Sequence, residues 1–236
     1  MGISVFITAT DTNAGKTFVT ASLARVLAAT KLKTCALKPV CCGRNPGQMN
    51  PDIKALLRAQ EMPDTQTGAV NLYDFTAAAA PDQAAAEQGM HIEPEKLVQW
   101  CAARMLEHDI TLIEGVGGLM VPLAENFMVS DWLAAMPDCI VVLVVRAKIG
   151  GINHALLTLK HLRHMQRDPA WIIINDVDHG GSKLLRHHAE AMAPRLKSGT
   201  RLLNLPHQQD MAHTVASSQF QALIADITQL ARREKR

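Results

Sequence analysis

The sequence predicts a doubly wound α/β fold of the P-loop NTPase type, with a mostly parallel sheet and helices on both of its faces. Apolar runs rich in β-branched residues alternate along the chain with segments of helical spacing. The runs at 139–147 and 170–174 are apolar on both faces, which is typical of parallel strands covered on both sides. The 236 residues suit one large domain, and a hydrophobic content of 48% can supply its core. We therefore expect one domain over residues 1–236.

The elements follow in order along the chain. Strands are expected at 4–10, 34–40, 110–115, 139–147, 170–176 and 201–206. Helices are expected at 16–29, 52–60, 94–107, 153–165, 182–193 and 217–234. The segment 61–93 is rich in Ala, Gln, Asp and Thr, and we expect an irregular surface excursion beside the site with some helix. The basic tail at 230–236 is interpreted as a solvated helix end, with a targeting role as the alternative.

Composition excludes several classes of protein. A net charge of +2 gives no reason to expect a nucleic-acid partner. The longest apolar run, at 139–145, is too short to cross a bilayer, and the N-terminus carries no export signal. The five cysteines lack C-x-x-C spacing, which fits a reducing cytoplasm and argues against a zinc ribbon. His187 and His188 are interpreted as part of a solvated helix face, with a metal site as the alternative.

Candidate site residues lie at the carboxyl ends of the expected strands, where ligands of such sheets bind. Six strand ends carry polar or glycine-rich residues. They are Asp11–Thr17, Lys38–Cys42, Glu114–Gly118, Arg146–Asn153, Asn175–Asp176 and Pro206–His207. This convergence is stronger evidence for a ligand site than any single motif.

The stretch "ATDTNAGKT" at 9–17 lies between a strand and a helix, as a P-loop does. Gly15, Lys16 and Thr17 match the end of the P-loop pattern, but Thr10 stands at the position of its first glycine. Free N–H groups at the helix start favour a phosphate, Lys16 would neutralise β/γ oxygens, and Thr17 would place a hydroxyl on Mg²⁺. The alternative is a capped helix with an exposed lysine.

Three further charged residues fit phosphate chemistry. Glu114 ends an apolar strand before "GVGG" and can hold Mg²⁺ as a Walker-B acid does, or it is an ordinary acid at a turn. Lys38 ends the second strand and would be a second cation over the same phosphates, or a surface lysine. Asp52 would be a second Mg²⁺ carboxylate, or a helix N-cap.

Two later strand ends complete the set. Asn175 and Asp176 could read the edge of a purine, although a turn is a strong alternative. The stretch "GGINHALL" at 150–157 opens a helix with two glycines. It could hold a carboxylate on its first N–H groups, or form a left-handed entry turn.

Together these motifs resemble the dethiobiotin synthetase family over nearly the whole chain. The matching stretches are "TDTNAGKT", "LKPV" with Cys41, Cys42 and Gly43, "IEGVGGLMVPL", "SDW" at 130–132, "GGINHALLT" and "IIIND". The family's loop reads T-D-T-x-x-G-K-T, so Thr10 is the family's form of the P-loop. Cys42 and Asp82 depart from the Ser or Thr and the His that are usual in the family, and Ala78 replaces a frequent proline.

The resemblance implies a reaction and a set of site residues. The family uses ATP and Mg²⁺ to carboxylate 7,8-diaminopelargonic acid with CO2 and to close the ring of dethiobiotin, releasing ADP and phosphate. Lys16 and Lys38 would be catalytic, Thr17, Asp52 and Glu114 would hold Mg²⁺, and a homodimer is implied. ATP contacts are implied for Asn13, Ala14, Gly15, Lys16, Thr17, Asp52, Glu114, Gly115, Val116, Gly117, Asn175, Asp176 and Pro206. Diamine contacts are implied for Thr12, Cys42, Gly118, Gly150, Gly151, Ile152 and Asn153, the last four reaching the substrate carboxylate of the neighbouring subunit.

Two other P-loop families remain as alternatives. Cobyrinic acid a,c-diamide synthases resemble the first half of the chain, but they usually carry a glutaminase domain for which 236 residues leave little room. ParA-like ATPases usually have an early second lysine, K-G-G-x-G-K-T, where this chain has "TDTNAGKT".

Overall fold

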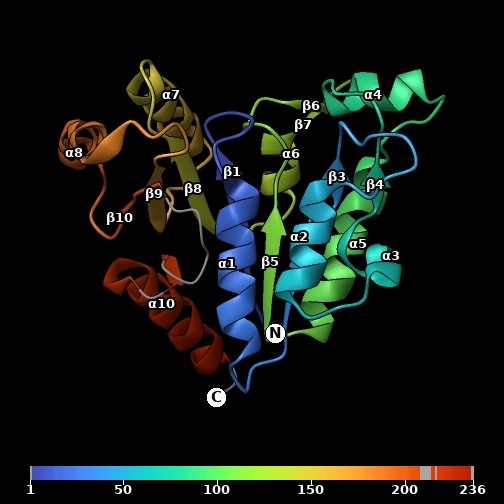
Figure 1. Ribbon diagram of the computed structural model, residues 1–236, viewed down its shortest axis with the longest axis horizontal. Helices are drawn as coiled ribbons and strands as arrows, with labels where there is room; N and C mark the ends of the chain where they lie inside the picture. The colour runs from blue at the N-terminus through green and yellow to red at the C-terminus, as the bar shows by residue number, and fades with distance from the viewer. Residues whose placement is uncertain (1, 208–213, 216, 235–236) are drawn as a thin grey trace.

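The computed structural model describes residues 2–207, 214–215 and 217–234. Its centre is a six-stranded parallel sheet of order β10-β9-β8-β1-β5-β2 (Figure 1). The strands are β1 (Ile3–Ala9), β2 (Thr34–Leu37), β5 (Ile110–Glu114), β8 (Ile140–Arg146), β9 (Trp171–Asn175) and β10 (Arg201–Leu205). The predicted fold class is therefore confirmed, and each predicted strand is found.

Helices cover both faces of this sheet and form two hydrophobic clusters with it (Figure 1). Because successive side chains of a strand point to opposite faces, Val5 and Ile7 of β1 join one cluster and Phe6 joins the other. The first face carries α1 (Lys16–Ala28), α2 (Pro51–Ala59) and α10 (Ser218–Glu234). The second carries α4 (Pro81–Glu87), α5 (Pro94–Glu107), α6 (Val129–Ala134), α7 (Gly151–His164) and α8 (Gly181–Met192).

The order of the strands places a topological switch beside β1. The chain leaves β1 for the edge strand β2 and returns to β5, whereas β8, β9 and β10 follow one another on the other side of β1. Ligands of open α/β sheets bind outside the carboxyl ends of the strands at such a point. The loop that follows β1 therefore occupies the position at which a ligand is expected.

The segment 61–93 contains the expected helix as η1 (Asp64–Gln66), α3 (Thr67–Val70) and α4. Other short elements lie outside the predicted set: β3 (Val40–Cys41) with β4 (Tyr73–Asp74), β6 (Pro122–Ala124) with β7 (Phe127–Met128), η2 (Ala193–Arg195) and α6. No helix or strand is predicted from the sequence between 116 and 138, since two to six residues show no clear period. Tertiary packing stabilises α6, because the Trp132 ring lies edge-on to Phe6 with centroids 4.9 Å apart. Helix α10 continues to Glu234, and residues 235–236 of the predicted basic tail lie outside the described residues.

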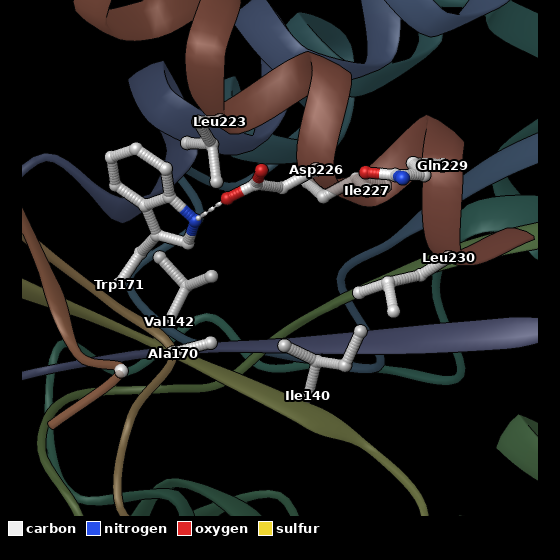
Figure 2. A pocket seen from close by; sticks show the side chains of 10 residues that line it. Ile140, Val142, Ala170, Trp171, Leu223, Asp226, Ile227, Gln229 and Leu230 are labelled. Atoms are coloured by element: carbon white, nitrogen blue, oxygen red, sulfur yellow. Dashed lines mark hydrogen bonds between the residues drawn. The ribbon is translucent and has the colours of Figure 1, made fainter.

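A small cavity of about 160 Å³ lies between α10 and the first residues of β8 and β9 (Figure 2). Its lining is mostly aliphatic, and its indole and carboxylate groups pair with each other: Trp171 Nε1 donates to Asp226 Oδ2 at 3.0 Å. Arg201 Nη1 also contacts Asp226 Oδ2, at 2.8 Å. This cavity is at the amino ends of the strands, which is the end opposite to the expected ligand site. None of the helices in the described ranges is long and apolar enough to cross a membrane.

Candidate active site

A cavity of about 940 Å³ opens at the carboxyl ends of β1, β2 and β5. The loop after β1, the residue after β2 and the last residue of β5 all contribute to its wall. It is lined by eleven of the predicted site residues: Thr12, Asn13, Gly15, Lys16, Thr17, Lys38, Cys42, Asp52, Glu114, Val116 and Gly117. Ala78, Ala79, Ala80 and Pro81 also line it, so part of the segment 61–93 borders the site.

The loop between β1 and α1 has a backbone that glycine makes possible. Gly15 precedes the first turn of α1 with φ of 94°, in the left-handed region that favours glycine. A Cβ at this position would lie 2.1 Å from Asn175 Nδ2, a separation that no side chain can accept. Asn175 Nδ2 donates to the carbonyl oxygen of Ala14 at 2.9 Å, so the end of β9 supports the loop.

Lys16 is buried in the cavity wall with an ammonium group that anions only partly compensate. Its Nζ donates to the carbonyl oxygens of Asp11 at 3.2 Å and Gly117 at 2.8 Å. Burial, and then the positive charge of Lys38, lower the pKa of Lys16 to about 8, although nearby carboxylates act in the opposite direction. An anion bound beside this ammonium would supply the missing negative charge.

Lys38 and Glu114 form a buried ion pair next to it, with Lys38 Nζ 2.5 Å from Glu114 Oε1. Burial by itself would lower the pKa of Lys38, but Glu114, Cys41 and Asp52 together outweigh it and raise that pKa above its usual value. Asp52 Oδ2 lies 3.5 Å from the same ammonium. Two lysines and two carboxylates thus meet at one end of the cavity.

The oxygen atoms around Glu114 fit a divalent cation. Thr17 Oγ1 donates to Glu114 Oε1 at 2.7 Å, whereas the buried Glu114 Oε2 makes no hydrogen bond to any residue that the structure describes. A hydroxyl and one or two carboxylates are the ligands that Mg²⁺ takes beside phosphates. Asp52 is not the helix N-cap that one reading of the sequence suggests. Asn50 is the cap, accepting from the Asp52 N–H at 3.0 Å, and this leaves the Asp52 carboxylate at the cavity.

Comparison with known proteins decides the family. A family model described as an AAA domain matches residues 4–214. The ATP-dependent dethiobiotin synthetase BioD 1 of Escherichia coli K12 is 36% identical over 192 residues, covering 79% of this chain and 82% of that protein. The dethiobiotin synthetase of Methylobacterium nodulans is 37% identical over 183 residues, covering 73% of this chain and 80% of that protein. This chain belongs to the dethiobiotin synthetase family.

Two solved structures of differently named proteins also share this fold. The hydrogenase maturation factor HypB of Archaeoglobus fulgidus gives a TM-score of 0.53 at 16% identity, covering 98% of this chain and 90% of its own. The septum site-determining protein MinD of Pyrococcus horikoshii gives 0.55 at 15% identity, covering 98% and 96%. At such identities the likeness shows the fold alone.

The remaining predicted residues do not line this cavity. Gly115 and Gly118 continue the backbone from β5, and Ala14 is buried in the loop. The Asp176 carboxylate accepts the N–H groups of Gly180 at 2.6 Å and Gly181 at 2.8 Å, which is the turn role weighed as the alternative. Pro206 is exposed after β10. Gly150, with φ of 84°, caps α7, whose first residues are Gly151, Ile152 and Asn153.

Other residues have positions that the sequence did not reveal. His188 is buried, against the expectation of a solvated face, because its ring faces the carbonyl oxygens of Leu184 at 2.9 Å and Lys148 at 3.2 Å. Asp11 and Lys148 fall within the predicted strand ends, but their mutual ion pair joins positions 137 residues apart, and no pattern in the sequence reports it.

Proposed function

We propose that this chain catalyses the ATP- and Mg²⁺-dependent conversion of 7,8-diaminopelargonic acid and CO2 to dethiobiotin, ADP and phosphate, a step of biotin synthesis. One amine of the diamine adds to CO2 and gives a carbamate. The carbamate oxygen attacks the γ-phosphorus of ATP and ADP leaves. The second amine then attacks the carbonyl carbon, the ureido ring closes, and inorganic phosphate departs.

The observation that carries this proposal is the meeting of Lys16 and Lys38 with Asp52 and Glu114 in one cavity at the carboxyl end of β1. Both the carbamate and the transferring phosphoryl group are anionic, so two buried ammonium groups would stabilise the charge that accumulates between them. Phosphoryl transfer depends mainly on such positioning and charge stabilisation, because the protein has little covalent chemistry to perform.

The roles of single residues follow from their places in the cavity. The backbone from Asn13 to Thr17 would bind the phosphates at the start of α1, and Lys16 would neutralise the β- and γ-oxygens. Thr17, Asp52 and Glu114 would hold Mg²⁺, which supplies charge neutralisation on the phosphates. Asn175 uses Nδ2 to hold the loop, so its amide oxygen is the atom left to read the amino group of adenine.

The diamine would lie over Thr12, Cys42 and Gly118, with its carboxylate on the first turn of α7 from a neighbouring subunit. The exposed apolar side chains near that turn support a homodimer, since Ile149 is 97% and Leu157 59% exposed. We also propose that the enzyme is cytoplasmic, because five free cysteines fit a reducing compartment. We propose further that the chain acts as one domain around its six-stranded sheet.

Phosphate release tests the function directly. The protein is incubated with ATP, Mg²⁺ and bicarbonate, with and without 7,8-diaminopelargonic acid, and dethiobiotin is detected by mass spectrometry. We expect release that depends on the diamine and a stoichiometric product. Folded protein that binds ATP yet shows no dependence on the diamine would contradict the substrate assignment.

A ParA-like ATPase is the competing function, and its signature lysine is the point of difference. Asp11 stands where the K-G-G-x-G-K-T loop has its first lysine, so the charge at this position is reversed. ATP hydrolysis stimulated by DNA and indifferent to the diamine would favour that competing function.

A further inference from the structure

A charged cluster outside the cavity wall joins two parts of the active-site region. Asp11, the second residue after β1, forms an ion pair with Lys148, which follows β8. His154 Nδ1, in the first turns of α7, lies 3.7 Å from Asp11 Oδ2. Asp11 Oδ1 and His154 Nδ1 are both buried and make no hydrogen bond to the residues described, so the carboxylate is held mainly by Lys148, with the His154 ring beside it.

The two sides of this cluster are each firmly attached to their own element. The carbonyl oxygen of Asp11 accepts from Lys16 Nζ at 3.2 Å, so its backbone belongs to the nucleotide-binding loop. The carbonyl oxygen of Lys148 faces His188 Nε2 at 3.2 Å. The start of α7 is tightly packed, because a Cβ on Gly151 would lie 2.5 Å from the carbonyl oxygen of Arg146. The Asp11 side chain is therefore a short connection between two rigid pieces.

We propose that Asp11 is a positioning residue that fixes the first turn of α7 to the nucleotide-binding loop through Lys148 and His154. The inference rests on the proposed function, in which that turn binds the diamine carboxylate and the loop binds ATP. Because that turn serves the site of the neighbouring subunit, the connection links the ATP loop of one protomer to the diamine carboxylate bound in its partner's site. A shift of the turn would move that carboxylate relative to the phosphates in the partner's site, and phosphoryl transfer is sensitive to displacements of about 1 Å. ParA-like loops have a lysine at the position of Asp11. In this chain the carboxylate at that position instead forms an ion pair with Lys148.

Two variants test the connection from opposite sides, and a third is the control. Asp11→Asn removes the charge with little change of shape, and Lys148→Met removes its partner. Asp178→Asn is the matched control, because Asp178 follows β9 and forms its ion pair with Arg146, the last residue of β8. For each variant we would measure the KM for the diamine, kcat, and the Kd of a non-hydrolysable ATP analogue.

We expect Asp11→Asn and Lys148→Met each to raise the KM for the diamine about tenfold, with the Kd for the ATP analogue changed less than about threefold. The double variant should be no worse than either single variant, because both remove the same interaction. Asp178→Asn should behave as wild type. Equal values of KM in all four proteins, or equal losses in KM and in ATP affinity, would overturn the inference.

Hydrogen exchange supplies a readout that does not depend on turnover. In the wild type, the ATP analogue should slow exchange of the peptide spanning 147–157, and Asp11→Asn should abolish this slowing. Absence of the slowing in the wild type, or its persistence in Asp11→Asn, would also overturn the inference. If the wild type makes no dethiobiotin but shows this exchange pattern, the proposed function fails while the connection stands.

Discussion

Lys16 should take up a proton when ATP binds, because its ammonium is only partly compensated in the free protein. Burial and the charge of Lys38 lower the pKa of Lys16 to about 8. The β- and γ-phosphates of a bound nucleotide would raise it again by supplying negative charge nearby. Binding at a pH near or above 8 therefore draws a proton from the solvent.

The size of the effect follows from the pKa of Lys16 in the free protein. With that pKa at about 8 and a bound value near the usual one, uptake is about 0.1 proton at pH 7, about 0.5 at pH 8 and about 0.9 at pH 9. The affinity for the nucleotide depends on pH in the same way: it is greatest below pH 8, where Lys16 is already charged. It falls about tenfold per pH unit above pH 8, until the pKa of the bound state is reached.

Isothermal titration with a non-hydrolysable ATP analogue measures this uptake. The titration is repeated at pH 8.5 in two buffers of different ionisation enthalpy, and the difference in observed enthalpy gives the number of protons. Lys16→Arg is the matched control, since a guanidinium stays charged throughout and should show no uptake. Equal enthalpies in the two buffers for the wild type between pH 7.5 and 9.5 would refute the reasoning, as would undiminished uptake in Lys16→Arg.

Three other predictions follow from the same site. Lys38→Met leaves the buried Glu114 carboxylate without its partner and should cost about 3–5 kcal/mol of unfolding free energy in urea titrations. The double variant with Glu114→Gln should recover most of this loss, and a double variant that recovers nothing would speak against the pair. Gly15→Ala should abolish binding of the ATP analogue, whereas Gly47→Ala, also at positive φ but in open space, should cost only about 1 kcal/mol and leave binding intact. Burial raises the pKa of Cys42 to about 11, so alkylation by iodoacetamide should be slow at pH 7.5 and accelerate up to about pH 11; fast labelling at neutral pH would contradict this.

The strands of the sheet could be predicted from the sequence because each is marked by residues that are neighbours along the chain. The strands at 139–147 and 170–176 are recognisable from runs of apolar β-branched residues, and "AGKT" after a strand marks the start of α1. The start of α2 is also a local feature, because Asn50 caps the helix and Pro51 is its first residue. The short elements β6, β7 and α6 show no local period, and α6 is stabilised by the packing of Trp132 on Phe6, a residue distant in the sequence.

For the candidate site, the sequence by itself determined which residue types stand at the strand ends and hence the family and the kind of chemistry. Lys16, Lys38, Asp52 and Glu114 could all be named from it. Only the tertiary structure decided how these groups pair: Lys38 with Glu114, Asp11 with Lys148, and Asn175 with the Ala14 carbonyl. It also decided that His188 is buried. The physical reason is that a strand end fixes where a side chain begins, whereas its partner and its pKa depend on charges and burial contributed by segments distant in the sequence.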